Sequence, residues 1–392
     1  MKELNERLNL LRDKIERGDK ITVAILGLGS VGCYLLDYLV SLSDPQLCIA
    51  VVGRNADKMI KDINIIRTAA TIRKQLRSEI TVVDNCDFTD VDSISNALSK
   101  VRPDFIVNSS RLYAGLKYGS ISWSNLRAYG IWSPLAVQLG KNIMEACEKV
   151  GSNAITINTS YSDAVIPWLK SAGHATFDFG SGNLNHLIPR MKFYIADKYG
   201  IKDLNAIDIT LVASHFHDVV ISKEGHTEGV DLLLSVKYKG EELPFDKEEL
   251  YRSCAIPMPT DQKRNMMNAS SNFDIITSVL TAVRDHKKLK IHVPGAGASI
   301  GGYPFIIDGT EDAVEAYYAP DFPLSEMIRV NRQSISHDGI EDIQDGRLVY
   351  TDKLINDVKL KFKVDLPKYV SLEDSSKVAS LLIDKIIIPN AN

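Results

Sequence analysis

Cysteine is scarce and widely spaced in this chain. None of its five cysteines forms a C-x-x-C pair; they are Cys33, Cys48, Cys86, Cys147 and Cys254. This spacing argues against a zinc site and against a disulfide framework, and it favours reduced thiols. The first residues are polar and lead into an amphipathic segment, so we expect no signal peptide. We therefore expect a cytoplasmic protein that holds no metal.

Long hydrophobic runs and basic clusters are also absent. No apolar stretch approaches the roughly 20 residues that a membrane-spanning helix needs. The formal net charge is −4, and the positive charges are not gathered in one segment, which argues against nucleic-acid binding. The 392 residues have an ordinary globular composition and suffice for two domains. We expect a small molecule as the ligand, no membrane or nucleic acid as a partner, and a homo-oligomer, most simply a dimer.

The clearest positive signal is a glycine-rich turn between a strand and a helix. A β-branched apolar run over 21–26 predicts a buried strand, and the apolar residues of 34–40 have helical spacing. Between them, G-x-G-x-x-G offers a tight turn, a close approach for a pyrophosphate and close helix–strand packing. The turn therefore predicts a dinucleotide site at Gly27, Gly29, Ser30, Val31 and Gly32. The alternative is a turn of the same shape without a ligand.

Strands and helices alternate as far as residue 165. Further strands are predicted over 46–52, 80–84, 104–108 and 154–160, with a long helix over 133–150. This alternation predicts an α/β fold whose residues 1–165 form a doubly wound parallel sheet of the Rossmann type. Residues 166–392 mix strands and helices, including a helix over 187–199, and predict an α+β domain for substrate binding and oligomerisation. A leading helix over 4–17 is expected to pack on the body or on a partner subunit.

The end of the second strand bears on the choice of cofactor. Gly53-Arg54-Asn55 has no acidic residue at the place where NAD-binding folds usually hold the ribose hydroxyls. Arg54 can instead face a 2′-phosphate with its guanidinium group. We predict NADP(H) as the preferred cofactor, with NAD(H) as the alternative, and Arg54 and Asn55 as part of its site. Asp87, after the third strand, is predicted on the adenine side.

Polar residues also follow two later strands. Asn108, Ser109 and Ser110 end the strand over 104–108, and Asn158 lies near the end of the next one. Ligands of parallel sheets bind outside the carboxyl ends of the strands. These side chains are therefore predicted to meet the nicotinamide half of the cofactor.

From residue 158 onward, the order of features resembles the lactate and malate dehydrogenase superfamily, to which the family-four glycosidases also belong. A strand ends near Asn158, a Gly180-Ser181-Gly182 segment follows, and a helix carries Arg190. The next strand leads into Ser214-His215-Phe216-His217-Asp218. The resemblance covers residues 21 to about 220, and the C-terminal third matches poorly.

The resemblance implies roles for four residues. Arg190 would bind a substrate carboxylate in a bidentate pair. His215 would exchange a proton with the substrate as hydride moves, and His217 is the second candidate for this role. Asn158 would hold the substrate oxygen or the nicotinamide ribose. The chain departs from the family at Leu187, where the Asp that orients the catalytic histidine is expected.

The function that the resemblance implies is an NAD(P)-dependent oxidoreductase acting on a small carboxylate-bearing hydroxy or oxo compound. The family's active-site loop carries another arginine, for which the candidates are Arg111, Lys117 and Arg127. Three alternatives stay open. They are an imine reductase like saccharopine or opine dehydrogenases, a family-four-like glycosidase that uses NAD and a metal, and a non-catalytic nucleotide-binding subunit. Leu187 favours the last of these.

Overall fold

A six-stranded parallel sheet forms the centre of the structure, a computed structural model that describes residues 1–113 and 115–390 without the side chains of residues 116, 117 and 120. The strand order is β3-β2-β1-β4-β5-β6, and every pairing is parallel. The strands are β1 (Ile21–Leu26), β2 (Leu47–Val52), β3 (Glu79–Val83), β4 (Phe105–Asn108), β5 (Ile155–Asn158) and β6 (Phe179–Gly180). This order confirms the predicted Rossmann-type sheet.

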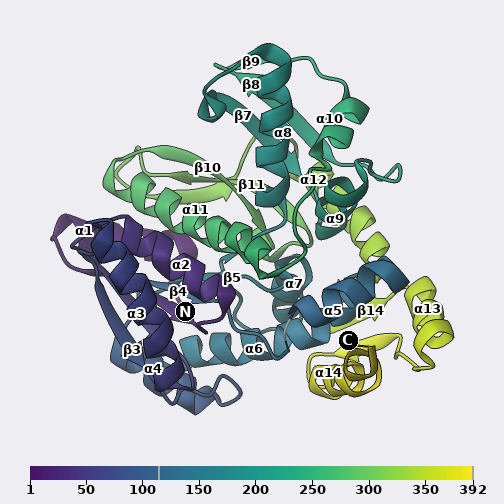
Figure 1. Ribbon diagram of the computed structural model, residues 1–392, viewed down its shortest axis with the longest axis horizontal. Helices are drawn as coiled ribbons and strands as arrows, with labels where there is room; N and C mark the ends of the chain where they lie inside the picture. Colours follow the sequence, from purple (N-terminus) through teal and green to yellow (C-terminus); the bar gives the residue numbers. More distant parts are fainter. Residues whose placement is uncertain (114, 391–392) are drawn as a thin grey trace.

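Helices cover both faces of the sheet, which explains why its central strands β1, β2 and β4 are largely apolar. On one face, Val23 and Ile25 of β1 pack in one core with α2 (Ser30–Ser41) and α3 (Ala56–Ile72). On the other face, Ala24 and Leu26 pack in a second core with α4 (Val91–Val101) and α6 (Ser133–Lys149). Figure 1 shows these four helices around the N-terminal sheet.

The chain beyond β6 mixes helices with antiparallel strands, as predicted. Its first elements are α8 (Leu184–Tyr199), β7 (Ile207–Val212), α9 (His215–Glu224), β8 (Leu233–Tyr238), β9 (Glu241–Glu242), α10 (Lys247–Cys254) and α11 (Asn265–Arg284). The next are β10 (Lys288–Pro294), β11 (Gly302–Asp308), β12 (Glu315–Tyr318) and α12 (Leu324–Ile335). The last are β13 (Ile340–Gln344), β14 (Arg347–Tyr350), α13 (Asp352–Phe362), β15 (Tyr369–Ser371) and α14 (Ser375–Leu382). They form three antiparallel three-stranded sheets.

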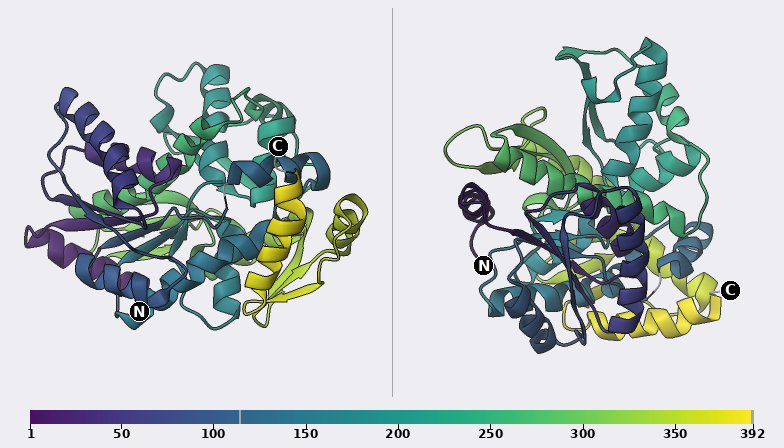
Figure 2. Two further views of the ribbon diagram at one scale, coloured as in Figure 1. Left: turned by 60° about the horizontal axis from the view of Figure 1, so that its bottom comes forward. Right: turned by 60° about the vertical axis from the view of Figure 1, so that its left-hand side comes forward.

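The C-terminal segment returns to the N-terminal half. Helix α14 packs on α6, and β13 packs on α7 (Ser162–Ser171), so the last 60 or so residues lie beside the loops that follow β4 and β5 (Figure 2). This return places residues near 338 at the edge of the parallel sheet. None of the helices within the described ranges is long and apolar enough to cross a membrane.

Several elements differ from their predicted form because tertiary pairing outweighs the local pattern. The glycine-rich segment around Phe179 supplies β6, so the sheet takes its sixth strand from beyond residue 165. The Gly302-Tyr303-Pro304 stretch, in which glycine and proline would locally favour a turn, begins β11 and pairs with β10.

The leading helix α1 (Leu4–Glu16) packs on the body of its own chain. The Arg12 guanidinium donates to the carbonyl oxygens of Gly309, Glu311 and Asp312 at 2.6, 2.6 and 2.9 Å. Arg7 forms a buried ion pair with Asp178, just before β6. Its two arginines therefore join the N-terminal helix to two distant parts of the fold.

Candidate active site

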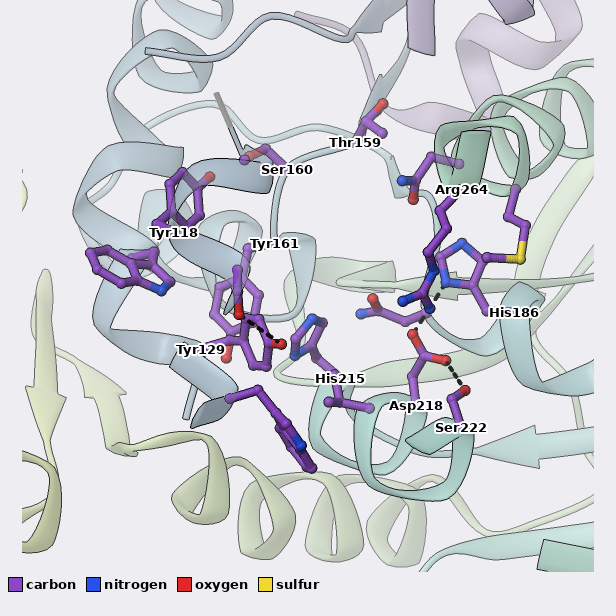
Figure 3. Close-up of a pocket in the computed structure, with 18 of the residues that line it drawn as sticks. Tyr118, Tyr129, Thr159, Ser160, Tyr161, His186, His215, Asp218, Ser222 and Arg264 are labelled. Atoms are coloured by element: carbon purple, nitrogen blue, oxygen red, sulfur yellow. Dashed lines mark hydrogen bonds and ion pairs between the residues drawn. The ribbon is translucent and has the colours of Figure 1, made fainter. Parts of the chain in front are cut away.

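A cavity of about 540 Å³ lies at the carboxyl ends of β4, β5 and β6 (Figure 3). Residues that directly follow these strands line it, among them Arg111, Thr159, Ser160 and Ser181. Helices α8, α9 and α11 supply further lining residues. This edge of a parallel sheet is where ligands bind in folds of this kind.

A histidine–aspartate pair stands in this cavity. His215 begins α9 directly after β7, and its Nδ1 lies 2.8 Å from Oδ2 of Asp338. Asp338 is buried in the 3₁₀ turn Ser336–Asp338 that precedes β13. Because the carboxylate accepts the Nδ1–H, Nε2 of His215 is the nitrogen left to exchange a proton with a ligand.

Two tyrosines hold the pair in place. The Tyr161 hydroxyl donates to the same Oδ2 of Asp338 at 2.7 Å, and the Tyr129 backbone N–H donates to Oδ1 at 2.9 Å. The rings of Tyr129 and Tyr161 meet the His215 ring edge-on, with centroids 4.9 and 5.0 Å away. The imidazole is therefore fixed in both position and orientation.

A second buried carboxylate supports His215 from its backbone. Asp163 of α7 accepts the His215 backbone N–H at 2.9 Å through Oδ2, and its Oδ1 accepts from the Asn183 amide. Burial raises the pKa of Asp163 to about 6, although the nearby His215 acts in the opposite direction. Asp163 thus satisfies a free N–H group at the start of α9.

The surroundings of His215 favour its charged form. Burial alone would lower the pKa of His215, but the charge and hydrogen bond of Asp338, with the charges of Asp163 and Asp218, raise it to about 9. The ring is therefore an imidazolium at neutral pH. In this form it is a proton donor.

The cavity contains a second histidine–aspartate pair. Nδ1 of His186, on α8, lies 3.2 Å from Oδ2 of Asp218, on α9, and the Ser222 hydroxyl donates to Oδ1 of the same carboxylate at 3.2 Å. Burial would raise the pKa of Asp218, but His186, His215 and Arg190 lower it, so the carboxylate is ionised. Nε2 of His186 is buried and has no hydrogen-bond partner among the described residues.

Cations outnumber unpaired anions around the cavity. Arg111, Lys223 and Arg264 line it, and none of the three forms an ion pair within the described part of the chain. The Asp218 carboxylate is hydrogen-bonded to His186, and the charge of Asp338 is balanced by His215. An excess of this sign attracts an anionic ligand.

The structure does not bring Arg190 to the cavity. Arg190 lies one turn beyond His186 on α8 and is buried, and its guanidinium donates to the carbonyl oxygens of Cys254 and Ser222 at 2.8 and 3.4 Å. One helical turn carries a side chain about 5 Å along the axis, which moves this group away from the sheet edge. The implied role as carboxylate anchor therefore has no geometric support.

His217 also lies away from the cavity. Its Nδ1 accepts the backbone N–H of Ser214 at 3.3 Å, and its Nε2 lies 3.4 Å from the Val230 carbonyl oxygen. Burial lowers the pKa of His217 to about 4, so the ring is neutral. Together with Ser214, the ring forms the capping box at the N-terminus of α9. Of the two candidate histidines, only His215 reaches the cavity.

The asparagines at the strand ends are bound to the protein itself. Nδ2 of Asn108 donates to Oδ1 of Asn158 at 2.9 Å, and Asn158 donates to the Ser160 carbonyl and the Ser162 hydroxyl. Both side chains are fully buried and do not line the cavity. They hold together the ends of β4 and β5, whereas Thr159, Ser160 and Tyr161 face the ligand space.

The glycine turn has the geometry that a pyrophosphate needs. Gly27 has a φ of +94°, and a Cβ on Gly32 would lie 2.4 Å from the Gly27 carbonyl oxygen. A Cβ on Gly29 would meet no atom within 4 Å, so the space beside this residue is open. The Ser109 hydroxyl braces the turn by donating to the Gly27 carbonyl at 2.7 Å. The turn and the first N–H groups of α2, at Ser30 and Val31, thus fit a dinucleotide phosphate.

The other predicted cofactor residues lie at the same sheet edge in different roles. Arg54 is exposed directly after β2. Asn55 caps α3, its Oδ1 accepting from the Lys58 N–H at 3.0 Å. Asp87 accepts the N–H and the hydroxyl of Thr89 at 2.9 Å. Ser110 donates to Oδ1 of Asn108 at 2.6 Å.

Among the three candidates for the loop arginine, only Arg111 is placed on the cavity. Arg127 pairs with Glu224 and Glu228 outside it. The side chain of Lys117 lies outside the described residues.

The polar side chains of His215-Phe216-His217-Asp218 do not come together as the ligands of a metal ion, which the family-four-like glycosidase alternative would need. The three polar side chains turn to different partners, namely Asp338, the Val230 carbonyl and His186. Across residues 1–113 and 115–390, no three His, Cys, Asp or Glu side chains are arranged to hold a metal ion.

Several residues of this site were missed by sequence reasoning. Asp338, Asp163 and Tyr161 support or position the His215–Asp338 pair, and His186 and Arg264 line the cavity. The absence of the family's Asp at Leu187 was a signal about the orienting carboxylate, but it was interpreted in favour of a non-catalytic subunit.

Comparison with known proteins identifies the fold. No family model matches the sequence, and no curated protein sequence matches it at a significant level. The malate dehydrogenase from Aeropyrum pernix matches with a TM-score of 0.51 and 14% identity, over 80% of this chain and 97% of that one. The Cryptosporidium parvum enzyme matches with a TM-score of 0.52 and 10% identity, over 81% and 99%. The Plasmodium falciparum enzyme matches with a TM-score of 0.50 and 13% identity, over 81% and 95%. The chain therefore has the malate dehydrogenase fold that its sequence resembles.

Proposed function

We propose that the protein is an NAD(P)-dependent oxidoreductase, with NADP(H) preferred, that acts on a small carboxylate-bearing hydroxy or oxo compound. The observation that carries this proposal is the His215–Asp338 pair in a cavity at the carboxyl edge of the sheet. The glycine turn at the same edge has room for a pyrophosphate.

The chemistry follows from the protonation state of His215. When bound, the nicotinamide supplies a hydride to the carbonyl carbon, or takes one in the reverse direction. As the C–H bond forms, the C=O π pair moves to oxygen, which takes the proton from Nε2 of His215. Asp338 keeps the proton on Nδ1 and stabilises the imidazolium before transfer. Oxidation runs the same steps backwards, with neutral His215 as the base.

We assign the substrate carboxylate to Arg264 instead of Arg190. Arg264 lines the cavity, immediately precedes the 20-residue helix α11, and makes no ion pair within the described part of the chain. Its charge influences the pKa of Tyr129 and of Lys223, two other residues that line the cavity. A guanidinium left free in such a place suits bidentate binding of a carboxylate.

The preference for NADP(H) rests on the end of β2. Arg54 is exposed there, and Gly53-Arg54-Asn55 carries no carboxylate to bind ribose hydroxyls. The carboxylate of Asp87, which follows β3, already accepts hydrogen bonds from the N–H group and the hydroxyl of Thr89.

The proposal is tested with the full-length protein. NADPH binding is measured by its fluorescence, and turnover with 2-oxo acids is measured as loss of NADPH absorbance. We expect micromolar binding of NADPH, turnover of at least one acid, and loss of turnover in His215→Asn with binding retained. A folded protein that binds neither NADPH nor NADH would refute the proposal.

An imine reductase is the second candidate, and the pair His186–Asp218 favours it. Joining an amine to an oxo acid needs proton transfer at a second point, and this pair supplies a second set of proton-binding groups in the same cavity. Turnover that requires an added amino acid along with the oxo acid would select this candidate. Cleavage of a glycoside that required NAD and was abolished by a chelator would instead point to the metal-dependent glycosidase alternative.

A further inference from the structure

The cavity has two walls of different chemistry, with His215 between them. The aromatic wall consists of Tyr118, Trp123, Tyr129, Trp132 and Tyr161, and the polar wall consists of His186, Asp218, Ser222 and Arg264. Figure 3 shows Tyr118, Tyr129 and Tyr161 on one side of His215, and His186, Asp218 and Arg264 on the other. A ligand that reacts at His215 therefore has one end on each wall.

The polar atoms of the aromatic wall are largely occupied by the protein. Nε1 of Trp132 donates to the Ser122 hydroxyl, and the Tyr129 hydroxyl donates to the Gly119 carbonyl oxygen at 3.2 Å. The Tyr161 hydroxyl is bound to Asp338. At these three residues, what remains for a ligand is the carbon surface of the rings.

The rings also support one another. Tyr118 and Trp132 have centroids 5.0 Å apart, and Trp123 and Tyr129 have stacked rings 6.5 Å apart. Tyr118, Trp123 and Tyr129 are half-buried, so part of each ring is still open to the cavity. A preformed aromatic surface of this kind binds flat apolar groups.

The charges near this wall argue against a cationic group as its ligand. The Arg127 guanidinium lies 4.5 Å from the centroid of the Trp123 ring, and Nζ of Lys223 lies 5.4 Å from it. The His215 imidazolium stands between the rings of Tyr129 and Tyr161. Because Lys223 and the His215 imidazolium already lie beside these rings inside the cavity, an ammonium group of a substrate would meet repulsion there.

We propose that the substrate is a 2-oxo or 2-hydroxy acid whose side chain is bulky, uncharged and aromatic. This inference rests on the proposed function. The carboxylate binds Arg264 on the polar wall, the reacting oxygen faces His215, and the aromatic side chain lies on the aromatic wall. A small acid would leave the aromatic wall uncovered and gain less from binding.

The experiment compares phenylpyruvate, pyruvate and oxaloacetate as substrates of the full-length protein with NADPH. We expect kcat/KM for phenylpyruvate to exceed that for the other two acids by about 10-fold or more, because the buried ring adds apolar contact that only this substrate makes. Trp123→Ala should lower kcat/KM for phenylpyruvate about tenfold more than kcat/KM for pyruvate, and Trp123→Phe should restore most of this difference. Tyr118→Ala gives an independent test should Trp123→Ala not fold. Phe193→Ala, which removes an exposed aromatic ring outside the cavity, is the matched control.

The possible outcomes test the aromatic substrate class and the oxidoreductase function separately. A preference for pyruvate or for oxaloacetate would overturn the aromatic substrate class and leave the oxidoreductase function standing. Equal losses for phenylpyruvate and pyruvate in Trp123→Ala would also overturn it, since the ring would then serve only the fold. A protein that binds NADPH and turns over none of the three acids would overturn this inference, and absence of NADPH binding would overturn the proposed function itself.

Discussion

His215 and Asp338 are 123 positions apart in the sequence, yet Nδ1 of one lies 2.8 Å from Oδ2 of the other. The histidine directly follows a strand that the sequence identifies, and the aspartate comes from a short turn after α12. The C-terminal third, where the resemblance is poor, is therefore part of the candidate active site.

The first prediction compares the two histidines. His215→Asn should lower kcat by roughly 10²–10⁴-fold, the usual range for a lost general acid or base, with NADPH binding retained. His217→Asn should leave the chemical step intact, because its ring faces Ser214 and Val230. Steady-state kinetics of both variants check this ranking. A variant His215→Asn with near-normal turnover would rule out the mechanism, and the reverse ranking would move the role to His217.

The second prediction concerns pH. Reduction needs protonated His215, so kcat/KM for reduction should be level near neutral pH and fall as pH rises through about 9, the pKa of the folded site. Because this pKa is raised from 6.5, the pair stabilises the fold fully below pH 6.5, and this contribution is lost as pH rises through about 9.

Variants around Asp338 test the origin of this pKa. Asp338→Asn should move the alkaline limb to lower pH, since burial then dominates. Tyr161→Phe should move it to higher pH, because the carboxylate oxygen no longer shares its charge with the hydroxyl. The groups around His215 include Asp338, Asp163, Asp218, Tyr129 and Tyr161. An alkaline limb that is the same in all three proteins would assign it to another group.

The third prediction tests the cofactor preference. A lost Arg–phosphate hydrogen-bonded pair costs about 1.5–3 kcal/mol, so Arg54→Ala should weaken NADPH binding roughly tenfold or more. NADH has no 2′-phosphate and should bind as before. Dissociation constants from fluorescence titration decide the matter. Equal weakening for both cofactors would show that Arg54 does not contact a 2′-phosphate.

The fourth prediction separates binding from folding in the glycine turn. Gly29 has a φ of −87° and open space beside it, so Gly29→Val should fold normally and lose NADPH binding, since its side chain fills the phosphate space. Gly32→Val should instead destabilise the fold, because its Cβ would press on the Gly27 carbonyl. Thermal unfolding and NADPH titration measure the two effects. A folded Gly29→Val protein with unchanged NADPH affinity would place the nucleotide elsewhere.

The fifth prediction distinguishes the two arginines. Arg264→Gln should raise KM for the acid about 10- to 100-fold with little change in the unfolding temperature, because it removes a charged contact to the carboxylate. Arg190→Gln should destabilise the protein by about 1–3 kcal/mol, because it leaves buried carbonyl groups without their donor. Were Arg190→Gln to raise KM and Arg264→Gln to leave it unchanged, the anchor would be Arg190 as the resemblance implies.

The sequence predicted best where structure depends on neighbouring residues. The strand over 21–26, its glycine turn and the strand that leads into Ser214-His215 all occur as predicted, because hydrophobic period and glycine spacing are local signals. The contact of the 3₁₀ turn Ser336–Asp338 with His215 could not be predicted from such local signals. Nothing in Ser336-His337-Asp338-Gly339 indicates a contact with His215, because that contact depends on how β13 packs against α7.

The polar residues at the strand ends show a second limit of sequence reasoning. Their position at the carboxyl edge was predictable, but their direction was not. Asn108 and Asn158 turn toward each other and tie β4 to β5, and Arg190 turns to the carbonyls of Ser222 and Cys254. Tertiary packing decides which polar side chains face a ligand and which form hydrogen bonds with buried backbone groups. This packing cannot be deduced from any one segment of the sequence.

The N-terminal helix α1 has a consequence for synthesis of the chain. It is synthesised about 300 residues before Gly309, Glu311 and Asp312, whose carbonyl groups Arg12 binds. Until those residues are made, Leu8 and Leu11, which are buried in the finished protein, are only partly covered. A nascent chain that stops before residue 312 therefore exposes an apolar face of α1, and this helix docks late although it is made early.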